Sequence, residues 1–200
     1  MTNRRNFIGQ ATVLVAGGVV GGSILSNCSN DNSKAATVQH ATPSLSKASN
    51  EHGMKLVVGS DHAGYALKAR LLNSIKELGY EIIDMGCFDE TPVDFPDIAQ
   101  KVCTAILNGD ARRGIMFCGT GVGAAIACNK IPGIRAAVCH DIYSAHQCVE
   151  HDDVQVIALG AQVVGHSVAL EYIERFLSAE FSTDEAFRRR VEKLNMMDRR

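Results

Sequence analysis

Short apolar runs alternate with stretches of helical periodicity along the chain from residue 54 onward. Residues 55–60 form an apolar run closed by Gly59, which is typical of a buried parallel strand. Residues 65–78 follow with apolar positions three and four apart, which predicts a helix, and Gly79 is placed to end it. The same alternation continues to the C-terminus. It predicts strands at 55–60, 80–84, 114–118, 135–139 and 154–159, and helices at 65–78, 98–107, 122–129, 142–149, 167–177 and 184–198.

Strict alternation with short connections predicts a parallel sheet covered by helices on both faces. We therefore expect a three-layer α/β/α, Rossmann-like fold with a five-stranded parallel sheet, in one domain that spans residues 54–200. No internal repeat or second domain boundary is visible. In such folds ligands bind at the carboxyl ends of the strands, so the functional residues are expected there.

Residues 1–53 have a different character from the rest of the chain. The pair Arg4-Arg5 precedes an uncharged, apolar segment at 11–25, which predicts an export signal at 1–28 of the twin-arginine type. Cys28 ends a segment that resembles a lipoprotein box, and residues 29–53 have the composition of a flexible linker. The expected location is therefore exported, either periplasmic or membrane-anchored through lipidated Cys28. The alternative is a disordered extension that happens to be apolar.

The charge of the domain limits its partners. Outside residues 1–53 the chain has 16 Lys and Arg against 20 Asp and Glu. A nucleic-acid-binding domain should be basic, so we expect no nucleic-acid partner. Trp is absent and aromatic residues make up 6% of the chain, so the core is expected to be aliphatic.

Residues 118–123 (CGTGVG) follow the third predicted strand and carry the most informative chemistry. Three glycines in five residues allow a tight turn that leaves N–H groups free to bind a phosphate or an oxyanion. Cys118 lies at the strand end facing a helix terminus, where the pKa of a thiol can be lowered, and Thr120 adds a hydroxyl donor. The segment lacks the Lys-Ser/Thr of a Walker loop and the G-x-G-x-x-G spacing of dinucleotide-binding folds. The competing interpretations are a merely structural turn and a buried, inert cysteine, as we expect for Cys103, Cys128 and Cys139.

Two further groups lie next to predicted strands. Asp61-His62 directly follows the first strand, and His151 comes just before the fifth. Taken alone, Asp61 could be a helix N-cap and either histidine could be an exposed surface residue. No spacing of His and Cys resembles a zinc site, so no metal site is expected.

Taken together, these segments resemble the ribose-5-phosphate isomerase B family, which includes the galactose-6-phosphate isomerase subunits. The resemblance covers residues 54–197, essentially the whole domain, and the order of its motifs is highly specific. The matching segments are 59–64 (GSDHAG), Tyr65-x-Leu67-Lys68, 93–96 (VDFP), 118–123 (CGTGVG), Asn129-Lys130, 133–136 (GIRA), His151-x-Asp153 and Gly165.

The resemblance implies an aldose–ketose isomerase that converts ribose 5-phosphate to ribulose 5-phosphate through a cis-enediolate, without metal or cofactor. It makes Cys118 the base and gives Thr120 and the loop N–H groups the enediolate oxygen. It assigns ring opening to His151 and the sugar hydroxyls to Asp61. The substrate-binding residues that it implies are His62, Gly119, Gly121, Val122, Gly123, Asp152, Gln162 and Arg190. It also implies a homodimer, or a tetramer built from it, in which a C-terminal helix reaches the partner.

Three segments depart from the family pattern, and all concern substrate recognition. Asp152 stands where Asn is usual, and Gln162 stands where an Arg that contacts phosphate is usual. In the C-terminal Arg-His-x-x-Arg segment, Ala186 and Phe187 replace Arg and His, whereas Arg190 is retained. Phosphate binding depends on charge-assisted Arg contacts. Either Arg188 or Arg189 takes over the phosphate contact and the substrate is the usual one, or one of two alternatives holds. These are an exported isomerase of a different sugar or sugar acid, phosphorylated or not, and a tethered sugar-binding protein without catalysis.

Overall fold

The computed structural model describes residues 54–198, and these form alternating strands and helices. The predicted export signal at 1–28 and linker at 29–53 lie outside the described residues. The strands are β1 (Lys55–Ser60), β2 (Glu81–Asp84), β3 (Arg113–Cys118), β4 (Ala136–Val138) and β5 (Val156–Gly160). The helices are α1 (Tyr65–Glu77), α2 (Phe95–Leu107), α3 (Val122–Cys128), α4 (Ile142–Asp152), α5 (His166–Ser178) and α6 (Glu185–Met197).

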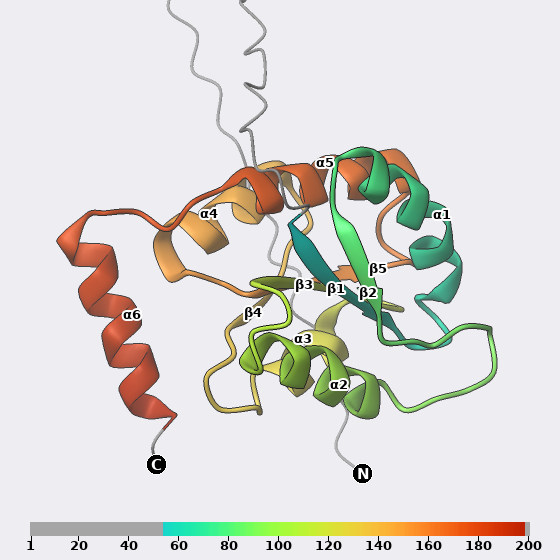
Figure 1. Cartoon of the computed structure of the whole chain (residues 1–200), viewed down its shortest axis with the longest axis horizontal. Coiled ribbons are helices and arrows are strands. Elements are labelled where there is room, and N and C mark those ends of the chain that lie inside the picture. The colour runs from blue at the N-terminus through green and yellow to red at the C-terminus, as the bar shows by residue number, and fades with distance from the viewer. Residues whose placement is uncertain (1–53, 199–200) are drawn as a thin grey trace, which may run out of the picture. The chain divides into compact units, whose positions relative to one another are not determined.

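The five strands form one parallel sheet in the order β2-β1-β3-β5-β4. Helices α1, α4 and α5 cover one face of the sheet, and α2 and α3 cover the other (Figure 1). The expected three-layer α/β/α fold with a five-stranded parallel sheet is therefore confirmed. The switch in strand order lies between β1 and β3, where connections run to opposite sides of the sheet.

Side chains along each strand alternate between the two layers, as the pleat requires. Ile115 and Phe117 of β3 pack among α1, α4 and α5, whereas Met116 and Cys118 pack on the side of α2 and α3. The core is mainly aliphatic, as expected from the composition. This alternation also determines that Cys118 faces the layer that contains α3.

Two helices differ from their predicted ranges in ways that affect the site. Helix α2 begins at Phe95, three residues early, because Asp94 has extended backbone and Pro96 suits a first helical turn. Helix α4 continues to Asp152, so His151 lies in its last turn, and Asp153 ends the helix in the left-handed conformation (φ 48°).

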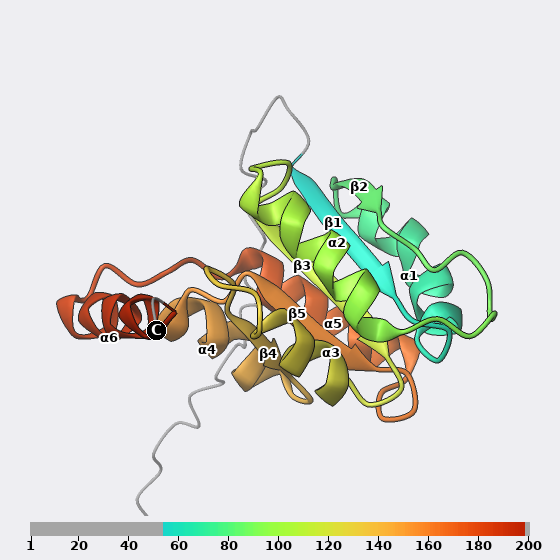
Figure 2. The same ribbon diagram turned by 90° about the horizontal axis from the view of Figure 1, so that it is seen from below.

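Helix α6 lies outside the three layers and contacts α4 (Figure 2). Of its residues only Val191 is buried. The predicted contact of this helix with a dimer partner stays a prediction. Among residues 54–198, no helix combines the length and apolar character needed to cross a bilayer.

Candidate active site

The loop after β3 holds Cys118 beneath a tight turn. Gly121 adopts a left-handed conformation (φ 82°), and α3 begins at the next residue. The N–H of Gly121 donates a hydrogen bond to Sγ of Cys118 at 3.0 Å, and the cysteine side chain is 4% exposed. An N–H directed at the sulfur stabilises negative charge on it. The predicted tight glycine turn is present, with Cys118 at the end of β3 close to the start of α3.

The loop is attached to the neighbouring strand as well as to its own. Cys118 pairs with Gly160 of β5, and Gln162 donates its N–H to the carbonyl of Gly119 at 2.9 Å. The side chain of Gln162 lies over the same glycine, since a Cβ on Gly119 would come within 3.4 Å of Oε1. Gln162, predicted as a substrate-binding residue, therefore borders the loop.

The predicted oxyanion donors divide into two groups. The N–H of Gly121 is taken by Sγ of Cys118, and the N–H of Val122 lies 3.3 Å from Oγ1 of Thr120. The N–H groups of Gly119 and Gly123 have no acceptor among residues 54–198. These two N–H groups and the exposed hydroxyl of Thr120 are the donors left to receive an oxyanion.

Asp61 lies at the end of β1, the strand next to β3. Its N–H donates to the carbonyl of Phe117 at 3.1 Å, and its Oδ1 accepts the N–H of Gly64 at 2.8 Å. A Cβ on Gly64 would come within 2.6 Å of the N atom of Cys118, so the two segments are in close contact. Asp61, 6% exposed, therefore lies beside the loop that holds Cys118.

His62 is exposed and contacts the segment that precedes α2. Its Nδ1 lies 3.3 Å from both the N and the O atom of Val93. The structure thus brings Asp61, His62, Cys118 and Thr120 to the same carboxyl edge of the sheet, as the sequence predicted.

A buried cation fixes the chain after β2 beside Asp61, a role that its place in a motif did not indicate. Nζ of Lys68, whose side chain is 1% exposed, contacts Oδ1 of Asp84 at 2.7 Å and the carbonyl of Cys87 at 2.6 Å. The N–H of Cys87 in turn donates to the carbonyl of Ser60, the residue before Asp61. The one sequence signal for this role is the position of Lys68 on an otherwise apolar helix face. That signal is weak, because lysines at such positions are commonly exposed.

His151, Asp152 and Arg190 lie at the opposite edge of the sheet. Helix α4 runs antiparallel to the strands, so its last turn is near the start of β5, and Nε of Arg135 donates to the carbonyl of Asp152 at 2.8 Å. Cys118 pairs with Gly160 at the far end of β5. Four residues of strand span about 13 Å. Strand and helix directions therefore place Cys118 and His62 at one edge of the sheet and Arg190 at the other within a single chain.

The other cysteines behave as small buried hydrophobes. Cys103, Cys128 and Cys139 are no more than 1% exposed, which confirms the expectation for all three. A side-chain hydrogen bond with Cys103, together with burial, raises the pKa of Cys128 well above its usual range. The thiol of Cys148, whose Sγ lies 3.9 Å from that of Cys139, has its pKa raised in the same way by that contact and by burial. Cys128 and Cys148 therefore stay protonated.

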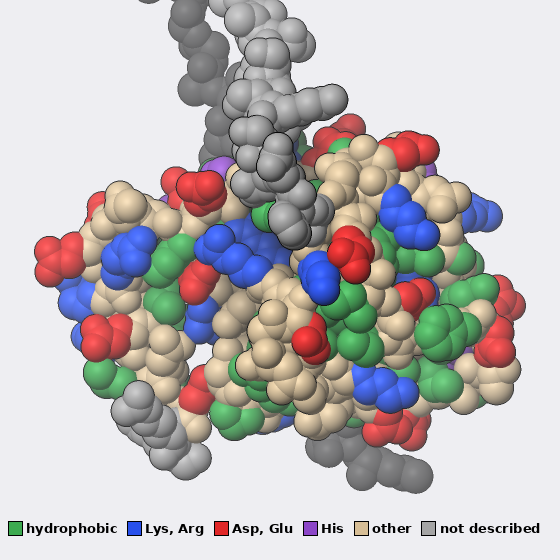
Figure 3. Space-filling view, viewed as in Figure 1, with side chains coloured by type: hydrophobic (Ala, Val, Ile, Leu, Met, Phe, Trp, Pro, Cys, Tyr) green, Lys and Arg blue, Asp and Glu red, His purple; other side chains and the backbone are tan. Residues whose placement is uncertain are grey.

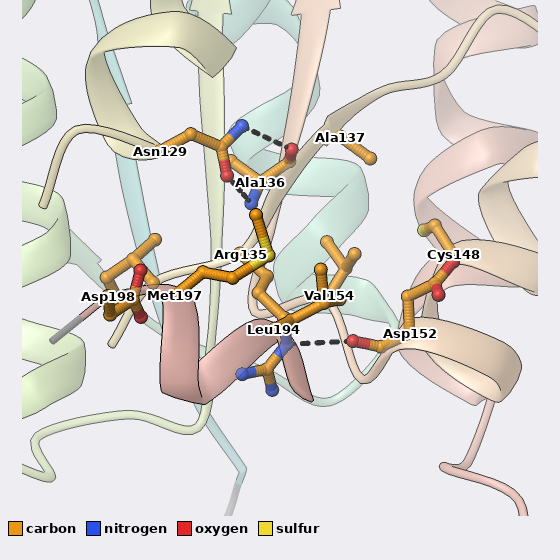
Figure 4. A pocket seen from close by; sticks show the side chains of 11 residues that line it. Asn129, Arg135, Ala136, Ala137, Cys148, Asp152, Val154, Leu194, Met197 and Asp198 are labelled. Atoms are coloured by element: carbon orange, nitrogen blue, oxygen red, sulfur yellow. Dashed lines mark hydrogen bonds between the residues drawn. The ribbon is translucent and has the colours of Figure 1, made fainter. Parts of the chain in front are cut away.

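A pocket of about 390 Å³ lies at the amino edge, between α6, the end of α4 and the start of β4 (Figure 4). Two of its polar side chains are already engaged: Arg135 with the end of α4, and Asn129 with both backbone polar groups of Ala136. On the face of the domain that Figure 3 shows, charged side chains of both signs are interspersed. No group of three or more His, Cys, Asp or Glu side chains placed to hold a metal ion occurs within residues 54–198.

The sequence profile of the family described as Ribose/Galactose Isomerase matches residues 56–194. The ribose-5-P isomerase B of Listeria innocua is 43% identical over 129 residues, 64% of this chain and 87% of that protein. The D-erythrulose-4-phosphate isomerase of Pectobacterium atrosepticum is 41% identical over 131 residues, 64% of this chain and 85% of that protein. The structure of ribose-5-phosphate isomerase B from Clostridium thermocellum is 44% identical with a TM-score of 0.71, and the match covers 73% of this chain and 98% of that one.

These matches contradict the expected location. The prediction of an exported, periplasmic or lipid-anchored protein rested on residues 1–28, which lie outside the described residues. The relatives are named for phosphorylated sugars, which are mainly metabolites of the cytoplasm, and the domain alone accounts for 98% of the C. thermocellum chain. The prediction of export is therefore wrong.

The glycine loop with its cysteine, the Asp-His pair on the neighbouring strand and the five-stranded sheet that positions them all lie inside the matched region. The match extends over more than half of the chain and agrees with the solved structures in fold. The chain therefore belongs to the ribose/galactose isomerase family, as a sugar-phosphate isomerase of the ribose-5-phosphate isomerase B type.

Proposed function

We propose that the protein interconverts ribose 5-phosphate and ribulose 5-phosphate through a cis-enediolate, with Cys118 as the base. The observation that carries this proposal is the enclosed Sγ of Cys118, which accepts the N–H of Gly121 beside two N–H groups that have no acceptor in the part of the chain that the structure describes. As a thiolate, Cys118 takes the proton from C2 of the open-chain aldose, which gives the enediolate. A proton passes from the C2 oxygen to the C1 oxygen, and the Cys118 thiol then returns its proton to C1 to give the ketose. The negative charge that develops on the substrate oxygen is stabilised by Thr120 and the loop N–H groups.

Asp61 and His62 bind the rest of the sugar. The carboxylate of Asp61 accepts hydrogen bonds from sugar hydroxyls, which suits its place at the end of β1 beside Cys118. His62 lies further out, where its ring can donate to the phosphate.

A second copy of the chain supplies the other half of the site. Within one chain His151 and Arg190 are on the wrong edge of the sheet to meet a substrate at Cys118. In a homodimer, the partner's His151 assists ring opening and the partner's Arg190 neutralises the phosphate. Next to the loop, α3 exposes Val122 (49%) and Ile126 (56%), apolar side chains that a second copy would cover.

Complementation between inactive variants tests the proposed mechanism and the shared site together. Cys118→Ser and His151→Gln should each lower turnover of ribose 5-phosphate by at least about 10³-fold, because each removes a proton-transfer group. Equal amounts of the two, unfolded and refolded together, should regain about a quarter of the wild-type activity, since half of the dimers are mixed and each mixed dimer has one intact site.

Cys103→Ala is the matched control, because it removes a buried thiol away from the loop. It should keep wild-type turnover. Full activity of Cys118→Ser would contradict the role of the thiol, and a refolded mixture without activity would contradict the shared site. A wild-type protein that binds the sugar phosphate without turning it over would instead favour the binding-protein alternative.

The second candidate is an isomerase of the same type that prefers a different sugar. It is favoured by Gln162, an uncharged side chain over Gly119 in the position where the family places a phosphate-contacting Arg. The Pectobacterium relative also shows that similar chains are named for a different sugar phosphate. Values of kcat/KM for ribose 5-phosphate, erythrulose 4-phosphate, free pentoses and uronates separate these candidates. Gln162→Arg should raise kcat/KM about 10-fold for a phosphorylated substrate and leave it unchanged for a free sugar.

A further inference from the structure

The imidazole of His151 is stacked on a phenyl ring from another helix. The ring centroids of His151 and Phe187 are 3.8 Å apart with an angle of 14° between their planes. The guanidinium of Arg190, one turn further along α6, lies 5.3 Å from the centroid of the same phenyl ring. Phe187 therefore contacts both residues that the proposed function assigns to the second half of the site.

A stacked ring restricts the plane of the imidazole but leaves its edge free. Both ring nitrogens of His151 are on that edge, and neither has a hydrogen-bond partner among residues 54–198. Histidines that act on a proton are commonly oriented by a hydrogen bond to one nitrogen. In this chain an apolar stack takes that place and leaves both nitrogens available.

The position of Phe187 is itself fixed by contacts between α6 and the domain. Nη1 of Arg135 donates to Oδ1 of Asn195 at 2.8 Å, while its Nε donates to the carbonyl of Asp152 at 2.8 Å. Farther along, Oδ2 of Asp198 accepts the N–H of Gly133 at 2.9 Å. Figure 4 shows Arg135 reaching the end of α4 beside Leu194 and Met197 of α6. One arginine thus ties the end of α4, which carries His151, to the helix that carries Phe187.

We propose that Phe187 is a positioning residue for His151: it holds the imidazole plane so that the ring nitrogens point out of the α4–α6 junction towards a substrate. This inference rests on the proposed role of His151 in ring opening. An unsupported imidazole samples several rotamers, so removing the stack should lower kcat more than it raises KM.

The test combines a spectroscopic measurement with kinetics on the full chain. In the wild-type protein labelled with ¹³C and ¹⁵N in histidine, the Cε1–H signal of His151, identified by its loss in His151→Gln, should be shifted upfield by the ring current of Phe187. In Phe187→Leu the signal should move downfield and kcat for the sugar phosphate should fall about 3- to 10-fold, with KM within about twofold of wild type. Phe187→Tyr should restore both the signal and kcat. If Phe187→Leu does not fold, Phe187→Met replaces it.

Phe181→Leu is the matched control. The Phe181 ring also contacts a guanidinium, that of Arg188 at 4.9 Å, but His151 is not its stacking partner. This variant should leave the His151 signal and kcat unchanged. Normal kcat in Phe187→Leu together with a loss of turnover in His151→Gln would overturn the inference and leave the proposed function intact. Normal turnover in His151→Gln would overturn both.

Discussion

Gly160 is the point where the sheet directly supports the loop that follows Cys118, so its replacement by alanine should disturb this loop without touching a side chain of the proposed site. Gly160 pairs with Cys118 across the β3–β5 boundary. A Cβ at this position would lie 2.6 Å from the carbonyl carbon of Thr120 and 2.7 Å from its Cα and O. All three atoms belong to the backbone and cannot move aside by changing a rotamer.

The size of the effect follows from these distances. Ordinary contacts of a Cβ begin at 3.4 Å, so the backbone of Thr120 must retreat by about 0.8 Å. Overpacking of this kind costs about 1–3 kcal/mol of stability. A shift of about 1 Å in a positioned group lowers the rate about 10²-fold. We therefore expect Gly160→Ala to fold, with kcat/KM reduced about 10²-fold.

Isomerisation of ribose 5-phosphate and urea denaturation measure the two effects separately. Gly165→Ala is the matched control, because it lies on the same connection to α5, has φ of −81° and leaves its Cβ in open space. It should behave as wild type in both assays. The reasoning is refuted if Gly160→Ala keeps wild-type kcat/KM while its stability falls, or if the control loses as much activity.

Three further predictions concern stability. Lys68→Met leaves Asp84 without its buried partner, and should lower the free energy of unfolding by about 3–5 kcal/mol in urea denaturation; a loss below about 1 kcal/mol would contradict a structural ion pair. The backbone N–H of Ser144, followed by its hydroxyl, lowers the pKa of Asp141 from its ordinary 3.8, so this carboxylate stabilises the fold above that pH. The advantage of wild type over Asp141→Asn in thermal unfolding should therefore disappear as the pH falls below the lowered pKa, and a gap that widens in acid would argue against it. Tyr172→Phe removes a hydroxyl that donates to a main-chain carbonyl at 2.8 Å, and should cost about 1 kcal/mol in urea denaturation, whereas equal stability would show that the bond contributes nothing.

The order of elements and the carboxyl-edge half of the site could be predicted from the sequence because both depend on local patterns. Apolar runs of five or six residues define β1 and β3, and the glycines around Cys118 specify the turn by their conformational freedom. Asp61 and Cys118 come together because adjacent parallel strands end at the same edge.

The half of the candidate site that lies at the amino edge of the sheet could not be predicted in the same way. His151 seemed to precede a strand, but α4 extends three residues beyond its periodic pattern and carries the histidine into its last turn. The stack of Phe187 on His151 joins residues 36 positions apart on helices whose contact no periodicity encodes. Lys68 was visible as part of a motif, yet its burial depends on Asp84 and on a backbone carbonyl after β2.

Because Cys118 and His151 are separated by the length of β5, an inactivating substitution in one chain can also affect the site that it shares with its partner. In the proposed dimer each site takes its thiol from one chain and its imidazole from the other. A chain altered at Cys118 alone would leave its intact partner with one working site. A chain altered at both Cys118 and His151 would silence both sites, so this double variant should act as a dominant inhibitor of the wild-type protein.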